Sequence, residues 1–310
     1  MQPHPICFHP PAAAKCRRRR GSSNGGTRPY GIAYNCSADI IVIGVHLVVA
    51  MRERVLAVIP ARFASSRFPG KPLALIGGRP MVEHVYRRLE QVKEIEEICV
   101  ATDDERIARA VREIGGRVVE TSGVHRCGTE RVAEVAQRRE ADVVLNVQGD
   151  MPFVEPGTVR AVLHLLLSDP ALPMATVKVP IIDRTVWLSP HVVKVVTDQQ
   201  GNALYFSRSP LPYWRDAAPS GAWGFKHLGI YGFRRAFLLE FAQLPPTPLE
   251  QAESLEQLRA LEYGYRIGVV EGSPGIDIEV DTPEDLERAE RAYAELTHDP
   301  YLVASRAGKR

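Results

Sequence analysis

The sequence lacks both of the common phosphate-binding fingerprints. No GxGxxG run is present, and Gly70-Lys71 is followed by Pro72 where a P-loop requires Ser or Thr. These absences exclude a dinucleotide-binding fold of the usual kind and a Walker nucleotide site. The chain also has no internal repeat and no linker long enough to separate two independent domains.

Cysteine is scarce and irregularly spaced. The 310 residues contain 5 cysteines, an odd number without a CxxC pair. This pattern fits a reducing compartment better than a disulfide framework, and we expect a cytoplasmic protein. His125 and Cys127 have little support as zinc ligands, because one residue separates them and no second pair lies nearby.

Long apolar runs and an excess of one charge are missing as well. Ile40–Val49 is apolar but is interrupted by His46, and it is far shorter than the roughly 20 residues of a membrane helix. Lys and Arg number 39 against 37 Asp and Glu, a formal charge of +2, with much of the positive excess in the first thirty residues. We therefore expect neither a membrane nor a nucleic acid as partner.

Residues 1–50 differ in composition from the remainder. Pro and Ala near the start are followed by Arg17–Arg20 and by a Gly, Ser and Asn patch. Such a segment buries too little apolar surface to become ordered. We interpret it as an extension from a start codon placed too far upstream, with Met51 as the natural first residue; a targeting segment is the alternative, although no convincing cleavage site follows it. The catalytic domain is expected over residues 51–300.

From residue 55 onward, apolar strands alternate with amphipathic helices. Strands are expected at Val55–Ile59, Glu97–Ala101, Val118–Glu120 and Asp142–Val147. Helices are expected from Pro80, over Asp103–Ile114 and over Thr129–Arg139. Connections of this length require crossovers between parallel strands. The pattern predicts an α/β fold with an open, mostly parallel, Rossmann-like twisted sheet and helices on both faces.

Beyond Pro156 the alternation loosens. A helix is expected over Val159–Leu167, and short runs rich in β-branched and aromatic residues follow between Pro and Gly. These runs are Met174–Val179, His191–Thr197 and Ala203–Ser207. We interpret them as a smaller strand-rich insertion that covers one side of the sheet. The last expected elements are helices over Arg234–Gln243, Glu253–Tyr263 and Pro283–Leu296, with a strand at Arg266–Glu271.

The loop Ile59–Pro72, which reads IPARFASSRFPGKP, is the stretch on which we expect the site to be built. It leaves a buried strand, precedes a helix, and carries Arg62, Arg67 and Lys71. A strand, a basic loop and a helix in this order are typical of phosphate binding in α/β proteins. Any one of these cations could be a solvated surface charge, but three within ten residues favour a functional loop.

Two carboxylates occupy positions suited to a divalent cation. Asp150 follows the strand Asp142–Val147, and Asp281 precedes the helix that begins near Pro283. Ligands of open α/β sheets bind at the carboxyl ends of the strands, and Mg²⁺ is usually held by one or two carboxylates together with phosphate oxygens. Capping of the last helix, alone or shared with Thr282, is the competing explanation for Asp281 and the better one if it is taken alone.

A series of segments in one order resembles the sugar-acid cytidylyltransferases, most closely the 3-deoxy-manno-octulosonate (Kdo) cytidylyltransferase family. After IPARFASSRFPGKPL come ATDDERIARAV, GTERVAEV, NVQGD, VKVV, ALYFSR, HLGIYGF, the segment Leu249–Gly264 and VDTPEDLER. The likeness covers about Val55 to Tyr293. It implies the fold of nucleotide-diphospho-sugar transferases, with a nucleotide-binding part at about 54–170, a sugar-acid and dimerisation part at about 171–265, and a returning strand and helix at about 266–297.

The resemblance also implies a reaction and a set of site residues. CMP would pass from CTP to Kdo with Mg²⁺, for lipopolysaccharide precursor synthesis, in a homodimer. The implied catalytic residues are Arg62, Lys71, Asp150 and Asp281, of which both aspartates are metal ligands. The implied CTP-binding residues are Ala61, Arg62, Ser66, Lys71, Cys127, Gly128 and Arg131. The implied sugar-acid-binding residues are Gln148, Arg208, His227, Tyr231, Glu256 and Gln257.

The implied sugar-acid residues each have a simpler explanation. Arg208 could be a surface ion pair, His227 a satisfied strand histidine, Tyr231 a core residue and Glu256 part of an exposed helix face. Other sugar acids, namely an amino-substituted Kdo or a nonulosonic acid, are alternative acceptors. A nucleotide-binding homologue that has lost catalysis is the alternative from another class.

Three positions depart from the family pattern. Cys127 stands where Ser is usual, Val124 where Asp is frequent, and Met151 where an acidic residue usually follows QGD. A thiol is a poorer hydrogen-bond donor than a hydroxyl, so the base preference is expected to be affected first. Loss of a carboxylate at Met151 is expected to alter the metal affinity or the tilt of Asp150.

Overall fold

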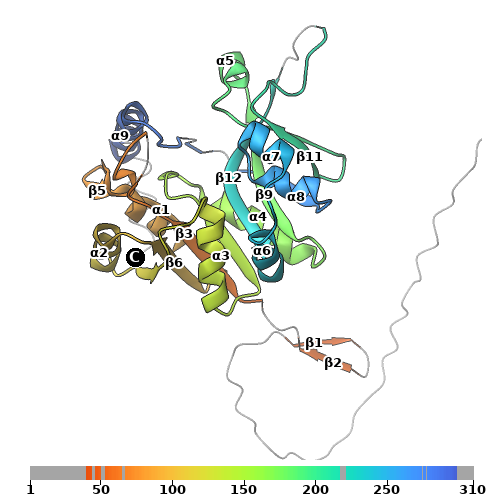
Figure 1. The fold of residues 1–310 in the computed structure, drawn as a ribbon, viewed down its shortest axis with the longest axis horizontal. Helices are drawn as coiled ribbons and strands as arrows, with labels where there is room; N and C mark the ends of the chain where they lie inside the picture. Colours follow the sequence, from red (N-terminus) through yellow and green to blue (C-terminus); the bar gives the residue numbers. More distant parts are fainter. Residues whose placement is uncertain are drawn as a thin grey trace, which may run out of the picture. The chain divides into compact units, whose positions relative to one another are not determined.

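The computed structural model describes residues 40–43, 46–49, 53–64, 67–216, 221–273, 275–276 and 278–298 (Figure 1). The chain divides into two compact units, residues 1–51 and 52–310, which we describe separately. In the first unit β1 (Ile40–Ile43) pairs antiparallel with β2 (His46–Val49). The sequence analysis did not predict these strands. Within the described ranges, no helix is both long and apolar enough to cross a membrane.

The second unit is built on four parallel strands in the order β7-β6-β3-β8. They are β3 (Val55–Pro60), β6 (Glu97–Thr102), β7 (Arg117–Glu120) and β8 (Val143–Val147). Burial on both faces explains why they read as continuous apolar runs. In β3, Ala57 and Ile59 pack into the core on one face, and Leu56 and Val58 into the core on the other. The predicted α/β fold with a mostly parallel sheet is confirmed.

The strands of the insertion extend this sheet and do not cover one of its faces, so that part of the prediction was wrong. They are β9 (Met174–Ile181), β10 (Lys194–Thr197), β11 (Ala203–Ser207) and β12 (Gly224–Arg234). β12 pairs antiparallel with β8 and β9, and β13 (Ile267–Glu271) adds parallel to β9. The physical reason is length: β12 has 11 residues and β8 only 5, so the first half of β12 has an open edge, on which β10 and then β11 pair.

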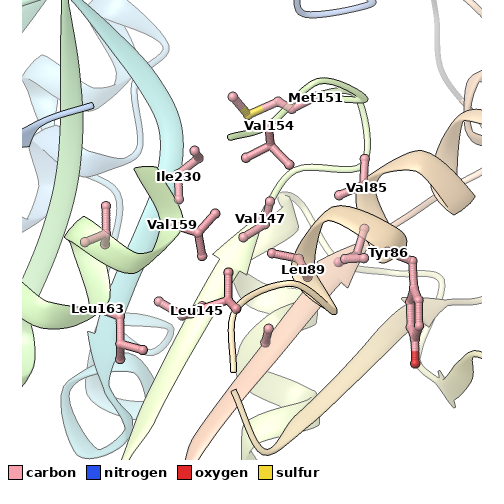
Figure 2. Close-up of a cluster of buried hydrophobic side chains, with 14 of the residues drawn as sticks. Val85, Tyr86, Leu89, Leu145, Val147, Met151, Val154, Val159, Leu163 and Ile230 are labelled. Carbon is pink, nitrogen blue, oxygen red and sulfur yellow. The ribbon is translucent and has the colours of Figure 1, made fainter. Parts of the chain in front are cut away.

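Helices cover both faces of the sheet (Figure 1). On one face lie α1 (Met81–Leu89), α2 (Glu105–Glu113) and α4 (Pro156–Ser168). On the other lie α3 (Gly128–Arg138), α6 (Arg235–Phe241) and α8 (Gln257–Glu262). Figure 2 shows the first core, in which Val85 and Leu89 of α1 and Val159 and Leu163 of α4 surround Leu145 of β8.

The helix predicted over Glu253–Tyr263 begins too early: its body is α8 (Gln257–Glu262), and its first residue ends a separate helix that was not predicted. A capping box of Thr247 and Glu250 begins α7 (Pro248–Glu253), and Ser254 ends it with a left-handed φ of 53°. The chain then turns before α8 begins. The remaining elements are the 3₁₀ turn η1 (Lys71–Leu73), β4 (Leu75–Ile76), β5 (Arg79–Pro80), α5 (Arg184–Leu188) and α9 (Pro283–His298).

Candidate active site

The basic loop reaches Lys71 through a turn that requires glycine. Gly70 has a left-handed φ of 74°, and its amide donates to the carbonyl of Phe63 at 2.9 Å. A Cβ at this position would lie 3.0 Å from the Phe63 ring. A side chain here would therefore be strained both by its backbone conformation and by its neighbour. The turn places Lys71 at the start of η1, facing a cleft.

Lys71 lies between the two predicted metal aspartates. Its Nζ donates to Asp150 Oδ2 at 2.8 Å and to Asp281 Oδ1 at 3.0 Å. Burial lowers the pKa of Lys71, but the two carboxylates outweigh burial and the net shift is upward. Burial likewise raises the pKa of Asp281, and the cations Lys71 and Arg67 outweigh it and lower the pKa overall. The two carboxylates therefore share one cation.

The main chain holds these carboxylates together and leaves Asp281 free for ionic contacts. The amide of Val280 donates to the carbonyl of Asp150 at 2.9 Å, which joins the segment before α9 to the end of β8. Thr282 and Asp285 cap α9 reciprocally, because Thr282 Oγ1 accepts from the amide of Asp285 at 3.3 Å and Asp285 Oδ2 accepts from the amide of Thr282 at 3.1 Å. Capping is thus not the role of the Asp281 side chain, which also pairs with Arg67 at 3.1 Å.

A cleft of about 240 Å³ opens beside these groups. Most of the predicted catalytic and nucleotide-binding residues line it together with Gln148, namely Ala61, Arg62, Lys71, Cys127, Gly128, Arg131, Gln148, Asp150 and Asp281. Arg67, the third cation of the basic loop, lines it too. Arg62 makes no ion pair with any residue in the part of the chain that the structure describes. The predicted Ser66 lies outside the described residues.

The start of α3 forms the wall opposite the basic loop. Cys127 and Gly128 occupy its first positions, where backbone amides and the helix dipole favour an anion. Burial, followed by the nearby Glu256, raises the pKa of the Cys127 thiol. Arg131 is 4% exposed and its Nη2 lies 3.0 Å from Asp103 Oδ1. The ion pair with Asp103 therefore holds the Arg131 side chain in place in this wall of the cleft.

The geometry suits one hard cation. Mg²⁺ needs only one or two protein carboxylates, because water and phosphate oxygens complete its coordination. Asp150 and Asp281 supply two oxygens that face a single positive charge. No cluster of three or more metal-ligating side chains occurs among the residues that the structure describes, so a site complete without water or phosphate oxygens does not fit there.

Comparison with known proteins identifies the family of this chain. Residues 56–267 match the family model described as cytidylyltransferase. The 3-deoxy-manno-octulosonate cytidylyltransferase of Geobacter sulfurreducens is 54% identical over 243 residues, which cover 76% of this chain and 97% of the relative. The same-named protein of Geobacter metallireducens is 53% identical over 244 residues, with 76% and 96% covered. This chain belongs to the 3-deoxy-manno-octulosonate cytidylyltransferase family.

A solved structure described as CMP:2-keto-3-deoxy-manno-octonic acid synthetase complexed with CTP agrees with this membership. It is 45% identical, has a TM-score of 0.74, and the match covers 78% of this chain and 99% of that one. The 4-diphosphocytidyl-2C-methyl-D-erythritol synthase of Anaerococcus prevotii, at 18% identity and a TM-score of 0.53, shares the fold.

In this Kdo cytidylyltransferase family member, four of the predicted sugar-acid residues form a cluster next to the cleft: His227, Tyr231 and Gln257 are buried, and Glu256 is half-buried. Tyr231 Oη donates to Gln257 Oε1 at 3.1 Å, and the His227 and Tyr231 rings lie 5.4 Å apart. Burial, with a smaller effect of Lys226, lowers the pKa of His227 to about 3. Glu256 is half-buried and its Oε1 accepts from Thr129 Oγ1, so the alternative of an exposed helix face is wrong. None of the four lines the 240 Å³ cleft directly.

Arg208 lies apart from this cluster and from the cleft lining. Its Nε donates to the carbonyl of Glu253 at 2.8 Å and Nη1 to the carbonyl of Pro190 at 3.1 Å. Its backbone amide donates to the Glu253 side chain at 2.9 Å. In this conformation Arg208 ties the end of β11 to the end of α7.

Met151 does not line the cleft that contains the aspartates. It is 5% exposed and packs with Val154 and Ile230 in the core (Figure 2). It also lines a separate, largely apolar cavity of about 460 Å³, which offers no cations for a triphosphate. The expected effect of Met151 on the metal affinity or on the tilt of Asp150 stays a prediction.

The sequence analysis missed two polar residues behind the cleft. Asn146 lies fully buried in β8 and Thr129 fully buried in α3. The available signal was Asn146 itself, a polar residue inside the apolar run VVLNV. A buried amide requires hydrogen-bond partners, and its partners lead back to the predicted residues Gln148 and Glu256.

Proposed function

We propose that this chain transfers CMP from CTP to Kdo, giving CMP-Kdo and pyrophosphate. The observation that carries the proposal is the cleft itself, in which Lys71 pairs with Asp150 and Asp281, Arg67 pairs with Asp281, and Arg62 lines the same space. Cations in this number match a triphosphate, whose negative charge shifts toward the leaving pyrophosphate during transfer. The relatives at 54% and 53% identity carry the name of this activity.

The two walls of the cleft would bind different parts of the nucleotide. Arg62, without an ion-pair partner among the described residues, is available to phosphate, and the first amides of α3 at Cys127 and Gly128 face the same space. Lys71, which contacts both aspartates, would neutralise charge near the α-phosphate. Cytosine selection is assigned to the segment that ends at Cys127 and Gly128, with Arg131 bracing it.

The proposal includes Mg²⁺ held by Asp150 and Asp281. When bound, such an ion supplies a Lewis acid for the phosphoryl oxygens and lowers the pKa of a coordinated hydroxyl. The chain's own contribution is to keep the two carboxylates on one cation through the Val280 amide and the Thr282 cap. Lys71 balances their charge.

The acceptor is assigned to the side of the cleft formed by Gln148 and the cluster behind it. The anomeric hydroxyl of the sugar acid forms the new bond to the α-phosphorus, the bond to the bridging oxygen of pyrophosphate breaks, and the hydroxyl proton is released. No side chain is assigned as general base.

The proposal extends to the setting of the enzyme. We place it in the cytoplasm, as a homodimer, in the supply of an activated sugar for lipopolysaccharide. Sedimentation of the purified full chain tests the dimer: a single species of twice the chain mass is expected, and a monomer at micromolar concentration would contradict it.

A matrix of the four nucleoside triphosphates against several sugar acids, read by pyrophosphate release, tests the reaction. CTP with Kdo is expected to give the highest kcat/KM. A higher kcat/KM with an amino-substituted Kdo or a nonulosonic acid would move the proposal to that acceptor. CTP binding without pyrophosphate release from any acid would refute it.

A further inference from the structure

A line of four side chains leads from the cleft into the interior. Gln148 lines the cleft, and its Nε2 donates to Asn146 Oδ1 at 3.1 Å. Asn146 Nδ2 donates to Thr129 Oγ1 at 3.1 Å. Thr129 Oγ1 in turn donates to Glu256 Oε1. Asn146 and Thr129 are 0% and 1% exposed, so water cannot substitute for a missing bond.

The direction of all three hydrogen bonds depends on Glu256. A carboxylate only accepts, so the Thr129 hydroxyl must use its proton on Glu256 and can only accept from Asn146. Asn146 must then turn its NH₂ group toward Thr129 and its carbonyl toward Gln148. Gln148 must donate to that carbonyl, which leaves its own carbonyl oxygen on the cleft side.

The position of this oxygen agrees with the deduction. Gln148 Oε1 would lie 3.3 Å from a Cβ placed on Gly128, the cleft-lining residue that opens α3. A side chain at position 128 would press on this oxygen, because 3.3 Å is a tight distance for a Cβ. Burial raises the pKa of Glu256, whereas Thr129, Cys127 and then Arg259 lower it by smaller amounts. Among these four residues, Glu256 is the one whose protonation would reverse the direction of the three hydrogen bonds.

We propose that Glu256, acting through Thr129 and Asn146, fixes the Gln148 amide with its carbonyl oxygen toward the cleft, so that the site tells the hydroxyl groups of the acceptor from its carboxylate. The inference rests on the proposed function. A carbonyl oxygen accepts from a hydroxyl and repels a carboxylate, whereas an NH₂ group in its place would donate to either and would not exclude the carboxylate. Glu256, Thr129 and Asn146 are positioning residues, and Gln148 is the group that meets the acceptor.

Thr129→Val tests the line with the least change in shape. Valine keeps the branched side chain but neither donates to Glu256 nor accepts from Asn146, and Thr129→Ser is the matched control that keeps the hydroxyl. KM for Kdo and kcat are measured by pyrophosphate release, and the dissociation constant of CTP by calorimetry. We expect a rise in KM for Kdo of about tenfold or more in Thr129→Val, CTP affinity within about twofold of wild type, and recovery in Thr129→Ser.

The outcomes separate this inference from the proposed function. An unchanged KM for Kdo in Thr129→Val, an equal loss of CTP affinity, or no recovery in Thr129→Ser would overturn the line while wild-type turnover upholds the reaction. If Thr129→Val does not fold, Glu256→Gln decides, because its amide allows both directions: a raised KM for Kdo with intact CTP affinity supports the line, and wild-type constants refute it. A wild-type chain without turnover on any sugar acid would overturn both.

Discussion

Replacing Lys71 with Met tests the cation that joins the two halves of the site. Methionine keeps an unbranched apolar stem of similar length and removes the ammonium group. Asp150 and Asp281, whose side chains are 27% and 35% exposed, would then face each other without the charge that now lies 2.8 and 3.0 Å from them. The ligand-free protein should lose stability, and turnover should nearly disappear.

The magnitude follows from the two bonds that are lost. A hydrogen bond to a charged group contributes about 1.5–3 kcal/mol, and the partial exposure of both carboxylates lets water recover part of that. We therefore expect the free energy of unfolding to fall by roughly 2–3 kcal/mol, and Tm by roughly 4–12 °C for a domain of this size. Pyrophosphate release should fall by about 10²–10³-fold, since a preorganised charge at the phosphoryl group is lost.

Arg67→Ala is the matched control for this experiment. Arg67 pairs with the same Asp281 at 3.1 Å, but its side chain is 61% exposed, and exposed pairs contribute under about 1 kcal/mol. Thermal melts of both variants, without and with Mg²⁺, are the assay. Mg²⁺ alone should raise the Tm of Lys71→Met more than that of wild type, because Asp150 has then lost its cation and Asp281 keeps only the exposed Arg67. Equal melting of Lys71→Met and wild type, or an equal loss in Arg67→Ala, would refute the reasoning.

Three further predictions concern the cleft and its buried neighbours. Asp150→Asn and Asp281→Asn should each abolish turnover while the fold is kept, and near wild-type pyrophosphate release at saturating Mg²⁺ would contradict the metal assignment. The pKa of His227 falls from 6.5 to about 3 on folding, so the unfolded chain takes up a proton at a higher pH than the folded chain does. The free energy of unfolding should therefore decrease as the pH falls from 6.5 toward 3, by about 1.4 kcal/mol per pH unit. Chemical denaturation should show this slope in wild type and not in His227→Gln, and identical slopes would count against the prediction. Because the pKa of the Cys127 thiol is raised, peptide mass spectrometry should find it alkylated by iodoacetamide far more slowly than a free cysteine at neutral pH, and a normal rate would exclude this environment.

The parallel half of the fold could be predicted because its signals are local. Strands buried on both faces are continuous apolar runs, and helices packed on one side repeat their apolar residues every three or four positions. The helix expected over Asp103–Ile114 corresponds to α2 (Glu105–Glu113), with Asp104 as its N-cap. These patterns do not depend on which distant segment lies next to them.

Three strands of the antiparallel half, β9, β10 and β11, could be predicted, but their arrangement could not, because it depends on pairing between distant strands. That β12 runs past the end of β8, and so has an edge for β10, is a property of relative lengths and register. The break before α8 was hidden for another reason: Ser254 adopts a left-handed conformation that its residue type does not announce. Glycine in that place would have marked the end of α7.

The site shows the same division between local and distant information. The basic loop and both aspartates could be selected from the sequence, and the structure brings Lys71, Asp150 and Asp281 together. The exchange of hydrogen bonds that holds them, from Val280 to Asp150 and between Thr282 and Asp285, could not be read from the residues alone. A Thr and an Asp three positions apart predict a cap, but not the freedom this gives to the carboxylate beside it.

Asn146 marks the limit of what a single residue can predict. An amide in the middle of a strand buried on both faces costs free energy unless it is hydrogen-bonded, so its presence alone indicates a polar partner in the core. The partners are Thr129 and Gln148, and the direction of their bonds is imposed by Glu256, which arrives from the far end of the chain at the start of α8. A helix that continued through Ser254 without the turn would place Glu256 elsewhere and leave the Thr129 hydroxyl without an acceptor. The orientation of one amide in the cleft thus depends on a break between two helices that do not line it.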